Sequence, residues 1–171
     1  MFVMKTFYHG SISKIDRPLT TAGRKNLDFG QGFYLTTIQE QAEKWAKFVA
    51  SRHLAKNTPC LNIYEMDIDN VTAEYKVLCF NEYDIEWLDF VVSCRKGEDR
   101  WREYDMITGG VANDKVIDTV EDYKNGIITA SQALGQLKFY KPNNQICISN
   151  QRIIDNYLIF KDCIKLQDYE G

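Results

Sequence analysis

Residues 28–37 read Asp-Phe-Gly-Gln-Gly-Phe-Tyr-Leu-Thr-Thr, the most specific ten residues of the chain. Within them, residues 30–35 predict a short strand opened by two glycines, which allow close backbone approach or unusual dihedral angles. Thr37-Ile-Gln-Glu40 is a capping-box pattern and predicts that a helix starts there. That helix carries residues at three- and four-residue spacing that are expected to share one face, namely Ala42, Trp45, Ala46, Val49 and His53.

The rest of the chain mixes strands and helices without regular βαβ alternation, which predicts an α+β fold. Alternating or apolar runs predict further strands at 5–8, 61–68, 104–108, 145–149 and 157–166. Helices are expected at 114–124, around 130–137, at 150–156, and after a cap at Asn81, bearing Ile85, Leu88 and Val92. The glycine-rich residues 109–114 are expected to form a loop.

Length and composition predict one globular domain, residues 1–171, because 44% of the residues are hydrophobic and 26% are charged. The formal net charge of −3 excludes a strong global basic field that would draw the chain to nucleic acid or an anionic membrane. The N-terminus has neither a signal-peptide pattern nor a spanning helix, so we expect a cytoplasmic protein without membrane contact.

Five cysteines and two histidines show none of the paired spacings that code for zinc, so no metal site is expected. The same cysteines lack a disulfide framework, and buried reduced thiols are the simplest interpretation. Gly30-x-Gly32 does not match the dinucleotide fingerprint, because Leu35 stands where glycine or alanine is required.

Three weak signals occur in a suggestive order: Tyr8-His9-Gly10-Ser11 at the end of the first strand, Tyr34 on the second, and Trp45 eleven residues later. Each has a plain structural alternative. A histidine at a strand end is commonly structural, tyrosine and tryptophan are commonly core aromatics, and the glycines near Tyr34 could serve only a bulge.

Together these residues resemble the ADP-ribosyltransferase superfamily, in its diphtheria-toxin and poly-ADP-ribose-polymerase branch, with its His, Tyr-x10-Tyr and Glu signature. They resemble in particular a small bacterial family of unknown function within that superfamily. Further matching blocks are Gln41-Ala42, Trp45-Ala46, Tyr104-Asp105, residues 110–114 and Asn144-Gln-Ile-Cys-Ile148. The resemblance implies two small, mostly antiparallel sheets packed together with flanking helices, and NAD as co-substrate in the cleft between them.

The resemblance also implies roles for individual residues. His9 would hydrogen-bond a ribose hydroxyl, the Gly10 backbone would pair with the nicotinamide carboxamide beside Ser11, and Tyr34 would stack on the nicotinamide ring. Trp45, in place of the second Tyr, would supply a flat apolar wall. Arg24 lies in a loop that would cover the NAD phosphates, although a solvated basic loop fits equally well.

The position that matches the catalytic Glu of the superfamily is Gln145, which can bind hydroxyls but cannot act as a base. Three outcomes stay open: a transferase whose nucleophile needs no enzyme base, an enzyme that recruits another carboxylate, or an inactive NAD-binding relic. The candidate carboxylates are Glu103, Asp105 and Asp114. Asn113, beside the last of these, would either reach the cleft or cap the helix that follows.

The function that the resemblance implies is mono-ADP-ribosyl transfer from NAD to a macromolecular acceptor, protein or nucleic acid, by the catalytic residues His9, Tyr34 and Gln145. A bacterial toxin with a cognate antitoxin, or a phage-defence protein, is the biological setting expected for such a chain. The alternatives are a catalytically inactive NAD-binding or partner-binding module and an NAD glycohydrolase.

Overall fold

The computed structural model describes residues 3–53, 57–112, 116–140 and 143–167. Its strands are β1 (Lys5–Ser11), β2 (Phe33–Leu35), β3 (Cys60–Met66), β4 (Val77–Cys79), β5 (Met106–Gly109), β6 (Gln145–Ile148) and β7 (Leu158–Lys165). Its helices are α1 (Gln39–Arg52), α2 (Ile68–Glu74), α3 (Ile85–Arg95), α4 (Ile117–Lys124), α5 (Ala130–Leu137) and α6 (Gln151–Tyr157), with the short 3-10 helix η1 at Arg100–Glu103.

The chain forms two compact units, which are described separately. Unit 1 comprises Met1–Leu19, Tyr34–Glu74 and Gln151–Gly171, and unit 2 comprises Thr20–Phe33 and Tyr75–Asn150. The boundary between the units therefore falls inside β2, after its first residue.

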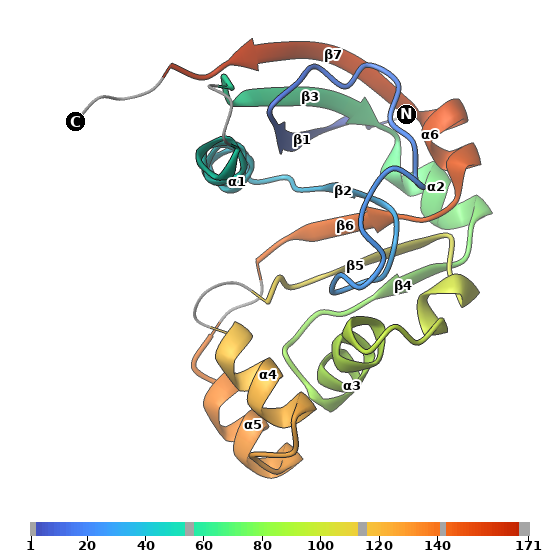
Figure 1. Ribbon diagram of the computed structural model, residues 1–171. Coiled ribbons are helices and arrows are strands. Elements are labelled where there is room, and N and C mark those ends of the chain that lie inside the picture. Colours follow the sequence, from blue (N-terminus) through green and yellow to red (C-terminus); the bar gives the residue numbers. More distant parts are fainter. Residues whose placement is uncertain (1–2, 54–56, 113–115, 141–142, 168–171) are drawn as a thin grey trace. The chain divides into compact units, whose positions relative to one another are not determined.

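Unit 1 is built on an antiparallel sheet in the order β1-β3-β7 (Figure 1). Helix α1 packs against β1, and the two meet where Gly10 faces the buried residues Ala42 and Ala46. A Cβ atom at Gly10 would overlap the carbonyl oxygen of Ala42 and lie 2.8 Å from the backbone nitrogen of Ala46. Small residues on both elements are therefore what lets the helix approach the strand this closely.

The segment after β1 is held on the sheet by polar side chains of β3. Asn62 is buried, accepts a hydrogen bond from the Ile15 backbone N–H and donates one to the Ser13 carbonyl. The Tyr64 hydroxyl donates to the Ile15 carbonyl. These bonds satisfy buried polar groups on both sides and fix the path of the chain as it leaves β1.

Unit 2 contains most of a four-stranded sheet in the order β2-β6-β5-β4, in which β5 pairs antiparallel with β6 and parallel with β4. Helix α3 supplies much of the core, and seven of its residues are buried: Trp87, Leu88, Phe90, Val91, Val92, Ser93 and Cys94. Helix α5 begins in a capping box, in which the Thr129 side chain accepts from the Gln132 backbone N–H and the Gln132 side chain accepts from that of Thr129.

The expected α+β class with two mostly antiparallel sheets is confirmed, and most predicted elements are present within a few residues. Helix α2 and strand β4 were not predicted, and both are short. Among the described residues, no helix is long and apolar enough to cross a membrane.

Two predicted helix starts are wrong. Helix α1 has Ile38 at its N-cap without a side-chain bond, and it is Thr36, not Thr37, whose hydroxyl accepts from the Ile38 N–H. Helix α3 is capped by Asp84, whose carboxylate accepts from the Trp87 N–H, so Asn81 is not the cap. Both helices begin later in the sequence than the pattern indicated.

Candidate functional site

His9 and Tyr34 come together in unit 1 although 25 residues separate them in the sequence. Tyr8 of β1 pairs with Thr36, the residue after β2, in an antiparallel bridge. The Tyr8 N–H donates to the Thr36 carbonyl (2.8 Å), and the Thr36 N–H donates to the Tyr8 carbonyl (3.0 Å). Beside this bridge, Nδ1 of His9 lies 2.6 Å from the carbonyl oxygen of Tyr34. The first two motif residues are therefore joined by a direct hydrogen bond.

That hydrogen bond determines the tautomer of His9. A carbonyl oxygen only accepts, so Nδ1 must carry the proton and donate it. Burial lowers the pKa of His9, and the hydrogen bond to the Tyr34 carbonyl opposes this shift without cancelling it. Near neutral pH the ring is consequently uncharged, and Nε2 is its hydrogen-bond acceptor.

Gly10 and Ser11 follow His9 on β1, opposite Leu61 and Cys60 of β3. Gly10 is required by the contact with α1 described above, which is a structural reason for this glycine independent of any ligand. Ser11 is half-buried, and its hydroxyl oxygen accepts from the Ser13 N–H.

Trp45 is expected to share one face of α1 with Ala42 and Ala46, but only the two alanines are buried. Its side chain is 47% exposed, and its ring lies 5.3 Å from that of Phe48, which is also exposed. The guanidinium of Arg52 lies over the Phe48 ring. His53, which the spacing groups with Trp45, is exposed too. Trp45 is thus a surface aromatic of unit 1 and not part of its core.

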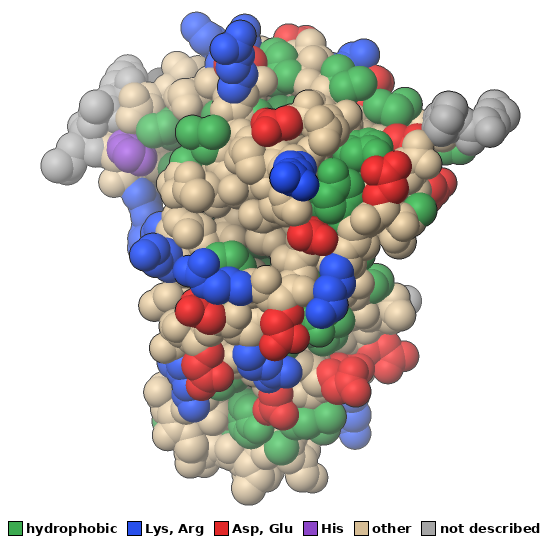
Figure 2. All heavy atoms as spheres, turned by 90° about the vertical axis from the view of Figure 1, so that its right-hand side faces the viewer, with side chains coloured by type: hydrophobic (Ala, Val, Ile, Leu, Met, Phe, Trp, Pro, Cys, Tyr) green, Lys and Arg blue, Asp and Glu red, His purple; other side chains and the backbone are tan. Residues whose placement is uncertain are grey.

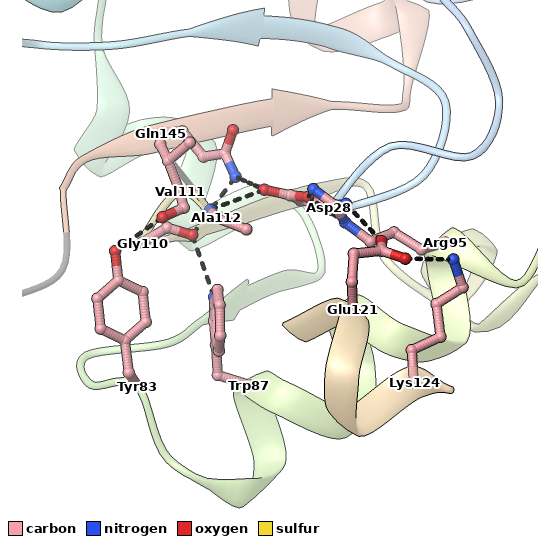
Figure 3. Close-up of polar contacts among 10 residues, drawn as sticks. All are labelled: Asp28, Tyr83, Trp87, Arg95, Gly110, Val111, Ala112, Glu121, Lys124 and Gln145. Carbon is pink, nitrogen blue, oxygen red and sulfur yellow. Dashed lines mark hydrogen bonds and ion pairs between the residues drawn. The ribbon is translucent and has the colours of Figure 1, made fainter. Parts of the chain in front are cut away.

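Gln145 is the first residue of β6 in unit 2, and it is buried. Its Nε2 donates to the carboxylate Oδ2 of Asp28 (3.3 Å) and to the carbonyl of Gly110 (3.4 Å). In Figure 3 the amide oxygen points away from both acceptors. The third motif residue therefore has a defined orientation, set by residues far from it in sequence.

Asp28 is the centre of this cluster. Its Oδ1 accepts from Nε (2.8 Å) and Nη2 (2.6 Å) of Arg95, and its Oδ2 also accepts from the Ala112 N–H (3.0 Å). Arg95 in turn pairs with Glu121, which Lys124 also contacts (Figure 3). Lys124 and Arg95 both lower the pKa of Glu121, with Lys124 making the largest contribution. The cluster alternates acidic and basic groups, so its buried charges are paired.

The segment after β5 is fixed by two aromatic side chains. The Trp87 indole N–H donates to the Gly110 carbonyl (3.1 Å), and the Tyr83 hydroxyl donates to the Val111 carbonyl (2.8 Å). Burial raises the pKa of Tyr83, so it remains a donor well above neutral pH. The Gly110 carbonyl, which accepts from Gln145, therefore lies in a segment fixed by two side-chain hydrogen bonds.

The remaining predicted residues contribute less. Arg24 is exposed in unit 2, and so is Glu103. Asp105 is engaged structurally, because its carboxylate accepts from the Lys76 N–H and from the Asn150 side chain. Asn113 and Asp114 lie outside the described residues. Asp28 is the site residue that sequence reasoning missed, although it opens the most specific block of the chain.

No group of three or more potential metal ligands occurs among the described residues. Acidic and basic side chains lie interspersed on the face drawn in Figure 2, in keeping with the small net charge. Neither observation favours a particular macromolecular acceptor.

Unit 1 thus carries His9, Gly10, Ser11, Tyr34 and Trp45, and unit 2 carries Arg24 and Gln145. A family model described as "Protein of unknown function (DUF3990)" matches residues 5–160, a range that includes all of these residues. None of the curated proteins matches the chain.

Proposed function

The chain belongs to the DUF3990 family, whose function is unknown, and we propose that it is a mono-ADP-ribosyltransferase that takes NAD as co-substrate. The observation that carries the proposal is the hydrogen bond from His9 to the Tyr34 carbonyl. It joins the two residues that the sequence resemblance assigns to the ribose and to the nicotinamide ring.

The chemistry of His9 fits a ribose. Because Nδ1 donates to Tyr34 and the ring is neutral, Nε2 is an acceptor, which suits the hydroxyl donors of a sugar. The Tyr34 ring is half-buried, so it retains exposed surface for a planar heterocycle. We propose that Gly10, Ser11, Trp45 and Arg24 complete NAD binding as the resemblance implies, with Trp45 exposed and therefore accessible to a ligand.

The transfer breaks the bond between nicotinamide and the ribose anomeric carbon, where positive charge develops as in glycoside hydrolysis. Nicotinamide departs with the bonding electron pair, while the acceptor bonds to the anomeric carbon and loses a proton. The resemblance assigns hydrogen bonding of the ribose to His9, its orientation for attack to Gln145, and stacking on the nicotinamide ring to Tyr34. Gln145 provides hydrogen bonds but no base, which favours an acceptor that ionises readily or a solvent base.

A macromolecular acceptor is proposed, and a toxin with a cognate antitoxin remains the biological setting suggested by the resemblance. A second candidate, an NAD-binding module without activity, is favoured by one observation: Gln145 has no negative charge to stabilise the transition state. NAD hydrolysis, with water as acceptor, is the third.

Nicotinamide release separates these candidates. The purified protein is incubated with NAD alone and with cell lysate plus labelled NAD, and nicotinamide and labelled macromolecules are measured. Labelled macromolecules together with released nicotinamide support transfer, and release with NAD alone indicates hydrolysis. NAD binding without release in either condition leaves the binding module.

The pocket assignment is tested by Tyr34→Ala against Tyr140→Ala, a tyrosine of unit 2 outside the assigned residues. Loss of stacking, worth about 1 kcal/mol, should weaken NAD binding roughly fivefold in Tyr34→Ala. Equal NAD affinity in the two folded variants would exclude the assigned pocket.

A further inference from the structure

We propose that Asp28 is a positioning residue that fixes the amide of Gln145, so that Oε1 is the atom offered to a hydroxyl of the ligand. The identity of that ligand rests on the proposed function, whereas the orientation of the amide does not. The proposal concerns unit 2 alone, where both residues lie.

The orientation follows from the chemistry of the two partners. The Asp28 carboxylate and the Gly110 carbonyl are both acceptors, so the atom of Gln145 that faces them has to be the donor, Nε2. The reversed amide would place Oε1 against two other acceptor oxygens in a buried place, where it would lose solvation without gaining a hydrogen bond from either of them. Oε1 is therefore directed away from Asp28, as Figure 3 shows.

Asp28 is itself held in place. Two hydrogen bonds from Arg95 fix one carboxylate oxygen, and the Ala112 N–H fixes the other, which is the oxygen that receives Gln145. Its side chain is only 9% exposed. Rotating this carboxylate would break a buried ion pair, so in the folded protein an oxygen of Asp28 stays directed at Gln145.

This arrangement also explains the residue type at position 145. A glutamate there would bring a second carboxylate within hydrogen-bonding distance of Asp28, and two buried like charges cannot both ionise. Glutamine avoids that repulsion and still presents an sp² oxygen that accepts from a hydroxyl. The absence of a glutamate is thus compensated in part, for binding and orientation but not for base catalysis.

The orientation can be tested in the wild-type protein without NAD. The Gln145 Nε2 and the Trp87 indole nitrogen both donate to the Gly110 carbonyl, so their protons lie within range of a nuclear Overhauser effect. We expect a cross-peak between the Gln145 side-chain NH2, assigned by its loss in Gln145→Met, and the Trp87 indole proton. Absence of that cross-peak overturns the proposal.

The role of Asp28 is tested by Asp28→Asn. Two hydrogen bonds from Arg95 hold the asparagine oxygen in place of Oδ1, so its NH2 replaces Oδ2, gives up the single bond from the Ala112 N–H and faces Gln145. The glutamine then flips and the cross-peak to Trp87 disappears. The matched control is Asp155→Asn, which alters the exposed pair between Gln151 and Asp155 and should leave the cross-peak intact. Persistence of the cross-peak in folded Asp28→Asn overturns the proposal.

A second variant decides the question if Asp28→Asn does not fold. In Gln145→Glu, repulsion from Asp28 should make the new carboxyl titrate at least about one pH unit above an ordinary glutamate, or let the protein fold only when acidified. Arg95, Glu121 and Lys124 are the other charged groups of the cluster. An ordinary titration with equal folding in acid and at neutral pH overturns the coupling.

The functional consequence is measured separately. With Oε1 replaced by a donor, Asp28→Asn should bind NAD about tenfold more weakly than Asp155→Asn. If the wild-type protein binds no NAD, the proposed function is wrong while the cross-peak experiment still decides the orientation. If NAD binds equally to both folded variants, Oε1 of Gln145 does not contact the ligand and that part of the proposal is overturned.

Discussion

His9 donates a hydrogen bond through Nδ1 to the backbone carbonyl of Tyr34, at 2.6 Å. The bond links a side chain of β1 to the backbone of β2, so the first motif and the second cannot move independently while it persists. A backbone acceptor is also insensitive to the identity of the side chain at position 34. Replacing Tyr34 therefore tests ring stacking without removing the partner of His9.

The first prediction concerns the pH dependence of stability. Burial lowers the pKa of His9 in the folded protein below the unfolded value of 6.5. Above pH 6.5 both states are neutral and the stability is complete. As the pH falls below 6.5 the unfolded chain gains a proton first, so the free energy of unfolding decreases until the folded pKa is reached. One proton limits the slope to about 1.4 kcal/mol per pH unit.

Chemical denaturation on either side of pH 6.5 measures this effect. His9→Gln keeps a donor near Tyr34 but removes the titration, so its stability should change less with pH than that of the wild type. His53→Gln is the control, because His53 is the other histidine and is exposed. The interpretation of His9 fails if His9→Gln and wild type lose equal stability on acidification.

The second prediction compares two glycines. Gly10→Ala drives a Cβ atom into the Ala42 backbone and should destabilise unit 1 by about 3 kcal/mol, since a helix must shift to make room. Gly135→Ala has nothing within 4 Å of the new Cβ and lies in α5, so it should stabilise by about 0.5–1 kcal/mol. Thermal or chemical unfolding measures both, and effects of the same sign would contradict the close packing of α1 on β1.

The same packing explains why Trp45 is exposed although its spacing groups it with two buried alanines. Spacing alone groups Trp45 with Ala42 and Ala46, but the contact at Gly10 admits only small residues. The helix therefore turns its two alanines toward the strand, and the neighbouring tryptophan lies at the surface. Periodicity predicts which residues share one face of a helix, but not which of them contact the neighbouring element. That choice depends on the shape of the neighbouring surface.

Asp28 illustrates a different limit of sequence reasoning. Its partners Arg95, Ala112 and Gln145 lie 67, 84 and 117 residues away, so no local pattern marks the cluster. By contrast, β6 and α5 were predicted because alternation and periodicity are local signals. His9 and Tyr34 were singled out from family resemblance, whereas the hydrogen bond between them required the structure.

The third prediction concerns the ion pair at Asp28. Arg95→Met leaves the Asp28 carboxylate without its cation at a place where its side chain is 9% exposed, and should cost about 3–5 kcal/mol. Arg102→Ala removes an exposed pair with Asp99 and should cost no more than about 1 kcal/mol. Urea denaturation of the two variants checks the difference, and equal midpoints would mean that Asp28 is solvated rather than held by Arg95.

The fourth prediction concerns thiol reactivity. The expectation of buried thiols holds for Cys60, Cys94 and Cys147, whereas Cys163 is partly accessible and Cys79 is exposed, and none of the five is in a disulfide. Burial, reinforced by the nearby charge of Asp28, raises the pKa of Cys94 to about 12. Because the thiolate is the reactive species, Cys94 should resist alkylation in the folded protein.

Iodoacetamide labelling at neutral pH followed by peptide mass spectrometry measures the order of modification. Cys79 should be modified first, Cys94 and Cys147 only after denaturation, and Cys79→Ser should remove the rapid phase. The Arg95→Met variant supplies an internal comparison, since loosening the Asp28 cluster should expose Cys94 to the reagent before the sheet residue Cys147. Rapid modification of Cys94 in the folded wild type would contradict the burial of α3, and with it the packing that holds Arg95 against Asp28.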